Sequence, residues 1–213
     1  MARITALRAA FRGSKRRSII VDGEEWRMTS AAVVRALGLA EGDDVDTEQL
    51  GTALAAAEVP AARERALRLL GYREHGSAEL REKLSADGYP PNLARTTVVA
   101  LGCVGLVDDD RYAALLARTL VDGRGYGRAR ARREMLHREL SEECVESALD
   151  ACCPSSEEYA RALALACRWA RPDLDVRKLA ARLARRGYPA RIAFQAAATA
   201  LDNPDAPPPE DSF

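Results

Sequence analysis

Apolar residues recur at spacings of three and four between residues 61 and 202, which is the periodicity of amphipathic helices. Short polar breaks such as "EHGS", "DGYPP" and "GLVDDD" divide this stretch into separate helices. Ser77 is expected to cap one helix start, Gly88 to stop a helix in the left-handed conformation, and Asp108 to Asp110 to cap the next start. The pattern predicts three helices in roughly each fifty residues.

The phrase Gly-Tyr-Pro occurs twice in this helical stretch, in "LSADGYP" and in "LARRGYP". The apolar positions around it align across three segments, with offsets of 51 residues (from 89 to 140) and 48 residues (from 140 to 188). The aligned positions are Leu80, Leu84, Tyr89 and Leu93, then Ala131, Met135, Leu140 and Cys144, then Leu179, Leu183, Tyr188 and Ile192. Chance could align apolar positions in a chain rich in Ala and Leu, but the shared Gly-Tyr-Pro register favours an internal repeat of a three-helix unit.

The repeated phrase is typical of a tight corner between two helices. Gly88 is expected to end one helix in a Schellman motif, in which Tyr89 packs back onto Leu84. The proline that follows is well placed to begin the next helix. The middle copy has Glu139 where Gly is expected, so its corner is predicted to be built differently, with Leu140 as the apolar contact.

The N-terminal residues have a different pattern. The segment "SIIVDGEEWRM" predicts a β-hairpin, because Asp-Gly is a favoured two-residue turn between β-branched and aromatic residues. It is the one convincing strand signal in the sequence. A short helix is expected from Ser30 to near Gly38, and another should be capped by Asp46 or Thr47 and end before Pro60.

These patterns predict a mainly α protein with a small N-terminal module that contains a β-hairpin. Its tandem three-helix units are expected to form an elongated, curved helical array of right-handed type. The predicted divisions are the N-terminal module at 1–60, the repeats at 61–109, 110–156 and 157–202, and a disordered, acidic and Pro-rich tail at 203–213.

The composition indicates in which cellular compartment the protein is expected. Apolar residues make up 47% of the chain but aromatic residues only 5%, as suits closely packed helices rich in Ala and Leu. The five cysteines are odd in number and form no C-x-x-C pair, so a disulfide framework is not expected. No apolar run approaches the roughly 20 residues that span a membrane, and no secretory leader is evident. We therefore expect a cytoplasmic protein that is not bound to a membrane.

The formal net charge of zero conceals blocks of opposite sign. The segment "GRGYGRARARREMLHR" carries six Arg against one Glu, whereas "SEECVESALDACCPSSEE" carries six acids and no Lys or Arg. The planar guanidinium group of arginine binds phosphates and carboxylates well, so the basic helices are candidates for contact with a partner protein or with DNA. The alternative is an ordinary solvated helix face. The candidate contact residues are Arg124, Arg128, Arg130, Arg132, Arg133, Arg138, Arg185 and Arg186.

Signals for catalysis are poor. His75 and His137 have no motif of a metal site or a nucleophile around them. The nearby Cys144, Cys152 and Cys153 match no usual zinc spacing, and "GRGYG" is not a phosphate-binding loop that follows a strand. We expect no catalytic residue, no metal site and no cofactor.

Three segments resemble the RecX family of recombination regulators: "YREHGSAELREKL", "GLVDDDRYA" and "LARRGYP". The resemblance covers residues 61–201, although "REHGS" departs from the family's Arg-Pro-His-Ser-like junction. It implies tandem three-helix repeats and a non-enzymatic regulator that acts in DNA repair, homologous recombination and the SOS response. Such a regulator binds in the groove of the RecA–DNA filament and modulates, most often inhibits, strand exchange, ATP hydrolysis and co-protease action. We expect this chain to act as a monomer on that filament, with single- or double-stranded DNA as a further contact of its basic helices.

A second hypothesis is a direct DNA-binding regulator, in which the Gly-Tyr-Pro corners are the turns of helix-turn-helix units. The helices after these corners, "NLARTTVVAL" and "ARIAFQAAATAL", are poor in the Arg, Asn and Gln side chains that read bases. Binding to duplex DNA without RecA would favour this alternative.

Overall fold

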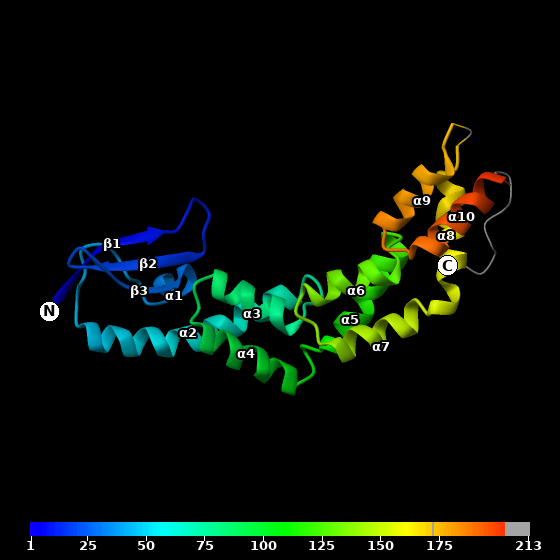
Figure 1. The fold of residues 1–213 in the computed structure, drawn as a ribbon. Coiled ribbons are helices and arrows are strands. Elements are labelled where there is room, and N and C mark those ends of the chain that lie inside the picture. Colours follow the sequence, from blue (N-terminus) through cyan, green and yellow to red (C-terminus); the bar gives the residue numbers. More distant parts are fainter. Residues whose placement is uncertain (172, 203–213) are drawn as a thin grey trace. The chain divides into compact units, whose positions relative to one another are not determined.

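The computed structural model describes residues 1–171 and 173–202. It confirms the predicted fold class, since the described chain is mainly α-helical with a small sheet near the N-terminus (Figure 1). The chain divides into two compact units, of which the first is Met1–Asp108 and the second begins at Asp109. The boundaries predicted for the N-terminal module and the three repeats remain predictions, and the tail at 203–213 lies outside the described residues.

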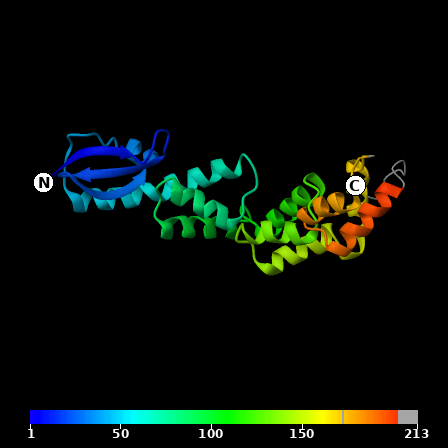
Figure 2. The same ribbon diagram turned by 45° about the horizontal axis from the view of Figure 1, so that its top comes forward.

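A four-stranded antiparallel sheet begins the first unit (Figure 2). Its strands are β1 Ala2–Ala9, β2 Arg16–Val21, β3 Glu24–Ser30 and β4 Asp44–Val45, in the order β3-β2-β1-β4. The predicted hairpin is confirmed: Asp22 and Gly23 have φ angles of 51° and 90°, the positive values of a type I′ turn. Strands β1 and β4 were not predicted, and pairings such as Ile4 with Val21 hold β1 on the hairpin.

Two helices follow the sheet strands. Helix α1 spans Ala31–Ala36 with Ser30 as its cap, close to the predicted start, and α2 spans Thr47–Leu70 with Asp46, one of the two predicted candidates, as its cap. The prediction that the second helix ends before Pro60 is wrong, because α2 continues through this proline. One face of α2 is buried on both sides of Pro60, and this packing outweighs the hydrogen bond that proline cannot donate. The buried stripe is Leu50, Leu54, Glu58, Ala62 and Ala66.

Helices α3 (Ser77–Ala86) and α4 (Pro91–Cys103) complete the first unit. Gly76, not Ser77, stands at the cap position of α3, because Ser77 already has helical geometry as the first residue of the helix. Both helices contribute to a single apolar core with α2 and the sheet, which contains Leu84 and Ile4. The sheet and the first three-helix group therefore fold as one body.

The second unit holds two further three-helix groups, each with its own apolar core. The second group consists of α5 Asp109–Arg118, a π-helical turn η1 Thr119–Gly123, α6 Arg128–Leu136 and α7 Glu142–Cys152. After a short 3-10 turn at Ser155–Glu157, the third group consists of α8 Glu158–Trp169, α9 Val176–Arg185 and α10 Ala190–Asp202. No helix in the described part of the chain has the length and apolar character required to cross a membrane.

The two Gly-Tyr-Pro corners have the predicted Schellman geometry. Gly88 has a φ of 100°, and the amide of Tyr89 donates to the carbonyl of Leu84 at 3.2 Å. Gly187 has a φ of 96°, and the amide of Tyr188 donates to the carbonyl of Leu183 at 3.3 Å. Both tyrosines are buried, so each ring packs into the core of its own group.

The middle corner turns at the same position as the other two, with Glu139 in place of glycine. Glu139 adopts the left-handed conformation itself, with a φ of 58°. The predicted contacts that follow it are present: Leu140 is buried, and the Ser141 hydroxyl accepts from the amide of Cys144 at 3.2 Å. The corner therefore tolerates a non-glycine residue at a cost of about 1 kcal/mol.

The glycine of the first corner also lies against the sheet. A β-carbon at Gly88 would lie 2.3 Å from the carbonyl oxygen of Thr29 in β3, which is closer than any real contact. The absence of a side chain thus lets the backbone of the corner touch the backbone of the strand. This contact fixes the first three-helix group on the N-terminal sheet.

Candidate functional site

The second and third three-helix groups meet through two glycines. The amide of Gly127, at the start of α6, donates to the carbonyl of Arg186 at 2.9 Å. A β-carbon at Gly127 would lie 2.7 Å from the carbonyl carbon of Gly187, and one at Gly187 would lie 2.4 Å from the β-carbon of Arg130. Neither position has room for a side chain, so the two backbones lie in direct contact.

Two arginine side chains connect the groups in opposite directions across this glycine contact. The Nη1 of Arg130 donates to the carbonyl of Arg185 at 2.8 Å, and the Nη1 of Arg186 donates to the carbonyl of Arg124. Four of the candidate residues, taken from segments more than fifty residues apart, are therefore brought together. Each guanidinium is held at one edge and keeps further N–H groups for other acceptors.

Two aromatic rings alternate with the guanidinium groups at the same place. Arg130 lies over the ring of Tyr126 at 4.1 Å from its centroid, and Arg182 lies over the ring of Trp169 at 4.0 Å. Arg186 lies near both rings, at 5.6 Å from the Tyr126 centroid and 5.4 Å from the Trp169 centroid. Cation–π attraction therefore holds the three guanidiniums in a row.

A pocket of about 590 Å³ opens beside this row. Four arginines line it, namely Arg124, Arg130, Arg168 and Arg186. Among the described residues that line it, the one carboxylate belongs to Asp122, whose Oδ1 is 2.8 Å from the Nη1 of Arg161. The pocket therefore carries an excess of positive charge. We call this surface, with Arg124, Tyr126, Arg130, Arg168, Trp169, Arg182, Arg185 and Arg186, the arginine seam.

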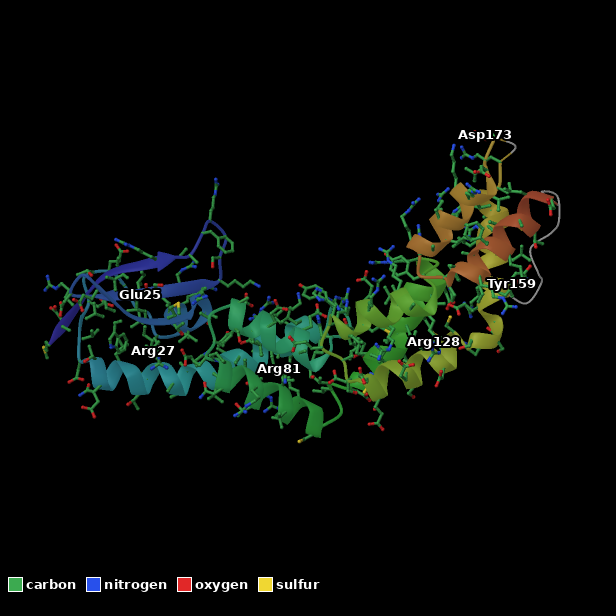
Figure 3. All side chains as sticks on the ribbon, in the orientation of Figure 1. Glu25, Arg27, Arg81, Arg128, Tyr159 and Asp173 are labelled. Atoms are coloured by element: carbon green, nitrogen blue, oxygen red, sulfur yellow. The ribbon has the colours of Figure 1, made fainter. Side chains whose placement is uncertain are left out.

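Three other arginines of the basic block contact acids or a tyrosine within their own group. Arg128 lies beside α7 (Figure 3), where its Nη2 is 2.5 Å from Glu146 and 2.7 Å from Asp150. Arg132 also binds Glu146, with its Nε at 2.6 Å from the carboxylate. The hydrogen bonds from Arg132 and Arg128 lower the pKa of Glu146, so this carboxylate stays ionised. These two arginines hold α6 against α7 and are not part of the arginine seam.

The two remaining candidates also lie outside the arginine seam. Arg138 donates to the hydroxyl of Tyr112 at 2.9 Å, which ties the end of α6 to α5. Arg133 is exposed on α6. The structure thus brings together four of the eight predicted contact residues and places the other four elsewhere on the second group.

Four members of the arginine seam were not predicted, namely Tyr126, Arg168, Trp169 and Arg182. A local signal existed for part of this set. Arg182 and Arg186 are four residues apart at the end of α9, so the two side chains could have been placed on one face. The docking of the third group on the second had no signal in the sequence, because it depends on contacts between distant segments.

The first unit has a different cluster at the equivalent register. The Nδ1 of His75 lies 3.1 Å from Glu79, and Arg73 also forms an ion pair with Glu79. Burial opposes ionisation of Glu79, but the hydrogen bonds from Arg73 and His75 outweigh it and lower the pKa to about 2. Burial lowers the pKa of His75. Among the described residues, no group of three or more His, Cys, Asp or Glu side chains is arranged to hold a metal ion.

Comparison with known proteins places this fold in a family. Residues 62–100 match the family model "RecX, first three-helix domain", and residues 108–149 match "RecX, second three-helix domain". A solved structure described as regulatory protein RecX has a TM-score of 0.58 and 22% identity, and covers 93% of this chain and 100% of its own. Another, RecX from Lactobacillus salivarius, has a TM-score of 0.58 and 18% identity over 69% of this chain. These likenesses show a shared fold.

Three relatives, each named regulatory protein RecX, show similarity in sequence. The Thermobifida fusca protein is 36% identical over 138 residues, which are 61% of this chain and 72% of the relative. The Xanthomonas axonopodis pv. citri protein is 38% identical over 128 residues, 59% of this chain and 78% of the relative. The Halorhodospira halophila protein is 35% identical over 96 residues, and this chain spans 59% of its length. The chain therefore belongs to the RecX family of regulatory proteins.

Proposed function

We propose that this protein regulates homologous recombination by binding the RecA–DNA filament. Binding lowers the strand exchange, ATP hydrolysis and co-protease activity of the filament. Membership of the RecX family supports this proposal, because the resemblance to RecX proteins implies a RecA partner. The protein acts by occupying a surface and not by catalysis, as the name regulatory protein of its relatives suggests.

The observation that carries the proposal is the arginine seam. Four guanidinium groups line one pocket, and the one carboxylate that lines it within residues 1–171 and 173–202 is paired with Arg161. A filament of protein and DNA offers phosphates and acidic side chains, which are the two groups that a planar guanidinium binds best. The glycine contact between Gly127 and Gly187 holds these cations on a preformed surface, so little ordering is required on binding.

The proposal is tested by adding the purified full chain to RecA, ATP and single-stranded DNA. We expect ATP hydrolysis to fall at stoichiometric amounts of the protein and filaments in electron micrographs to shorten. A double charge reversal, Arg124→Glu with Arg168→Glu, should weaken this inhibition, because both side chains are exposed cations at the pocket. Unchanged hydrolysis, strand exchange and filament length with the unaltered protein would refute the proposal.

The arginine at position 95 offers a matched control. Arg95 is an exposed residue of α4 in the first unit, far from the arginine seam in sequence. Arg95→Glu changes the net charge by the same amount per substitution and should leave inhibition unchanged. If Arg95→Glu and the seam variants reduced inhibition equally, the effect would reflect net charge and the arginine seam would have no special role.

A further inference from the structure

We propose that the arginine seam binds the backbone phosphates of single-stranded nucleic acid and does not read the bases. The inference rests on the proposed function, because the strand it concerns is the DNA of the RecA–DNA filament. It deepens that function by assigning the arginine seam to the DNA and not to the recombinase. Its support is independent of the family models, which end at residue 149, whereas Trp169, Arg182 and Arg186 belong to the third three-helix group.

Charge restricts the ligand to an anion. Arg124 and Arg168 are exposed at the pocket, and the ion pair of Arg130 with Glu134 is long, at 3.8 Å. An anion in this pocket therefore meets several cations whose charge is not cancelled by carboxylates of the described part of the chain. A neutral ligand would leave this repulsion between cations in place.

A buried donor adjoins the same pocket. A small cavity of about 60 Å³ shares Asp122, Leu165 and Arg168 with the pocket and is also lined by Arg161. Within the described chain, the Nε of Arg161 is buried and has no hydrogen-bond acceptor. A buried N–H without an acceptor is costly, and an oxygen atom of a ligand or of its hydration shell would satisfy it.

The way in which the rings are used decides between phosphates and bases. Proteins that stack single-stranded bases leave the faces of aromatic residues open to the strand. Here guanidiniums lie over both rings, with Arg130 at 4.1 Å from the Tyr126 centroid and Arg182 at 4.0 Å from the Trp169 centroid. A guanidinium stacked by its face presents its N–H groups at its edges, where they can bind a phosphate in a bidentate manner. The rings therefore hold the cations in place, and the cations contact the strand.

The arrangement of the cations favours a strand over a free nucleotide. The groups alternate in a row from Arg130 through Tyr126, Arg186 and Trp169 to Arg182, with neighbours 4.0–5.6 Å apart. A strand presents its phosphates in a line, whereas a nucleoside triphosphate gathers them at one point. A succession of cations joined through the two rings thus matches the successive phosphates of a strand better, and it does so without regard to base sequence.

The experiment measures binding of a fluorescein-labelled oligothymidylate of roughly 15 nucleotides to the full chain by anisotropy, without RecA. We expect the oligonucleotide to bind and an abasic strand of the same length to bind within about twofold, because the contacts are to phosphates. Arg124→Glu with Arg168→Glu should weaken binding at least tenfold and reduce the salt slope by about 1.4, which is about 0.7 for each lost phosphate contact. Arg95→Glu, outside the arginine seam, should change neither value.

Trp169 locates the binding site. In a Trp26→Phe background it is the only tryptophan of the chain, since the sequence contains two. Its fluorescence should change on titration with the oligonucleotide, and an unchanged signal despite measurable binding would place the strand elsewhere and overturn the inference. Tenfold weaker binding of the abasic strand, or displacement by ATP or polyglutamate at lower concentrations than by unlabelled oligonucleotide, would also overturn it.

The inference and the proposed function can fail separately. If the oligonucleotide does not bind but the protein still lowers RecA-dependent ATP hydrolysis, the arginine seam contacts protein, and the inference falls while the proposed function stands. If the oligonucleotide binds at the arginine seam but RecA activity is unaffected, the proposed function falls and the inference stands.

Discussion

The contact between Gly127 and Gly187 predicts a large loss of stability when either glycine gains a side chain. The two positions differ in backbone conformation: Gly187 has a φ of 96°, whereas Gly127 has an ordinary φ of −70°. Gly127→Ala therefore tests close approach alone, and Gly187→Ala tests close approach together with left-handed strain. Gly38→Ala tests strain alone, because Gly38 has a φ of 65° and a β-carbon there would meet nothing within 4 Å.

The expected magnitudes follow from these geometries. Left-handed strain on a residue with a β-carbon costs roughly 1–2 kcal/mol. Forcing a methyl group into contacts at 2.7 Å from the carbonyl carbon of Gly187 should cost a further amount, of about 1–3 kcal/mol. We thus expect losses of about 1–2 kcal/mol for Gly38→Ala, about 1–3 for Gly127→Ala and about 2–5 for Gly187→Ala. The double variant at 127 and 187 should lose less than the sum, because both changes open one contact.

The assay is urea unfolding of the full chain in the Trp26→Phe background, in which Trp169 reports on the second unit. Gly38→Ala lies in the first unit, so its loss is followed by circular dichroism. A loss below about 0.5 kcal/mol for Gly127→Ala would refute the reasoning, because it would mean that the two groups separate freely to admit a methyl group. Strict additivity in the double variant would show that the two glycines do not share one contact.

Three further substitutions test other parts of the fold. Glu139→Gly should stabilise the second unit by about 1 kcal/mol in urea unfolding, because Gly accepts a φ of 58° without strain, whereas Glu139→Ala keeps the β-carbon and should give no gain. Glu79→Gln should remove part of the pH dependence of the free energy of unfolding. Because the pKa of Glu79 is lowered to about 2, its carboxylate contributes stability above pH 4.5 that is lost as the pH falls toward 2. Over that window the wild type should lose about 2 kcal/mol more than the variant. Arg27→Ala should destabilise the first unit by about 3 kcal/mol in thermal unfolding, because it leaves a buried carboxylate without its cation. That carboxylate belongs to Glu58, which is 2% exposed and lies 3.1 Å from Arg27. Glu58→Gln in the Arg27→Ala background should recover part of the loss.

Features that depend on a few adjacent residues could be predicted from the sequence. The Schellman corners at Gly88 and Gly187 require only a glycine, a nearby leucine and a tyrosine, so their geometry follows from local chemistry. The type I′ turn at Asp22 and Gly23 is local in the same sense. The repeat itself could be found because each group uses the same corner at nearly constant spacing.

Features that depend on distant contacts could not be predicted in this way. Strand β1, with the sequence "ARITALRA", has weak strand character of its own and is held by pairing with β2. Helix α2 continues through Pro60 because residues on both sides of it pack into the core of the first unit. In both cases tertiary packing outweighs the local preference.

The candidate site could be predicted only in part, because it too depends on contacts between distant segments. Arginine density marked the segment that lines the pocket but did not distinguish cations that face acids of their own group from cations that face a pocket. The alternation of basic and acidic blocks was visible in the sequence, and consecutive antiparallel helices bring such blocks together. Pairing of Arg128 and Arg132 with Glu146 could therefore have been inferred before the structure.

A change of side chains at one register explains how one repeated backbone gives two different surfaces. His75 and Glu79 of the first group correspond to Tyr126 and Arg130 of the second, at the offset of 51 residues that relates the two groups. In the first pair the Nδ1 of His75 lies 3.1 Å from the carboxylate of Glu79, whereas in the second pair a guanidinium lies 4.1 Å from a ring centroid. The second pair keeps its cation at the surface because the third group supplies the carbonyl of Arg185, at 2.8 Å from the Nη1 of Arg130, to hold it there. The repeat thus determines the backbone, and the exchange of Glu for Arg at one position, together with a docked neighbour, determines where an anion can bind.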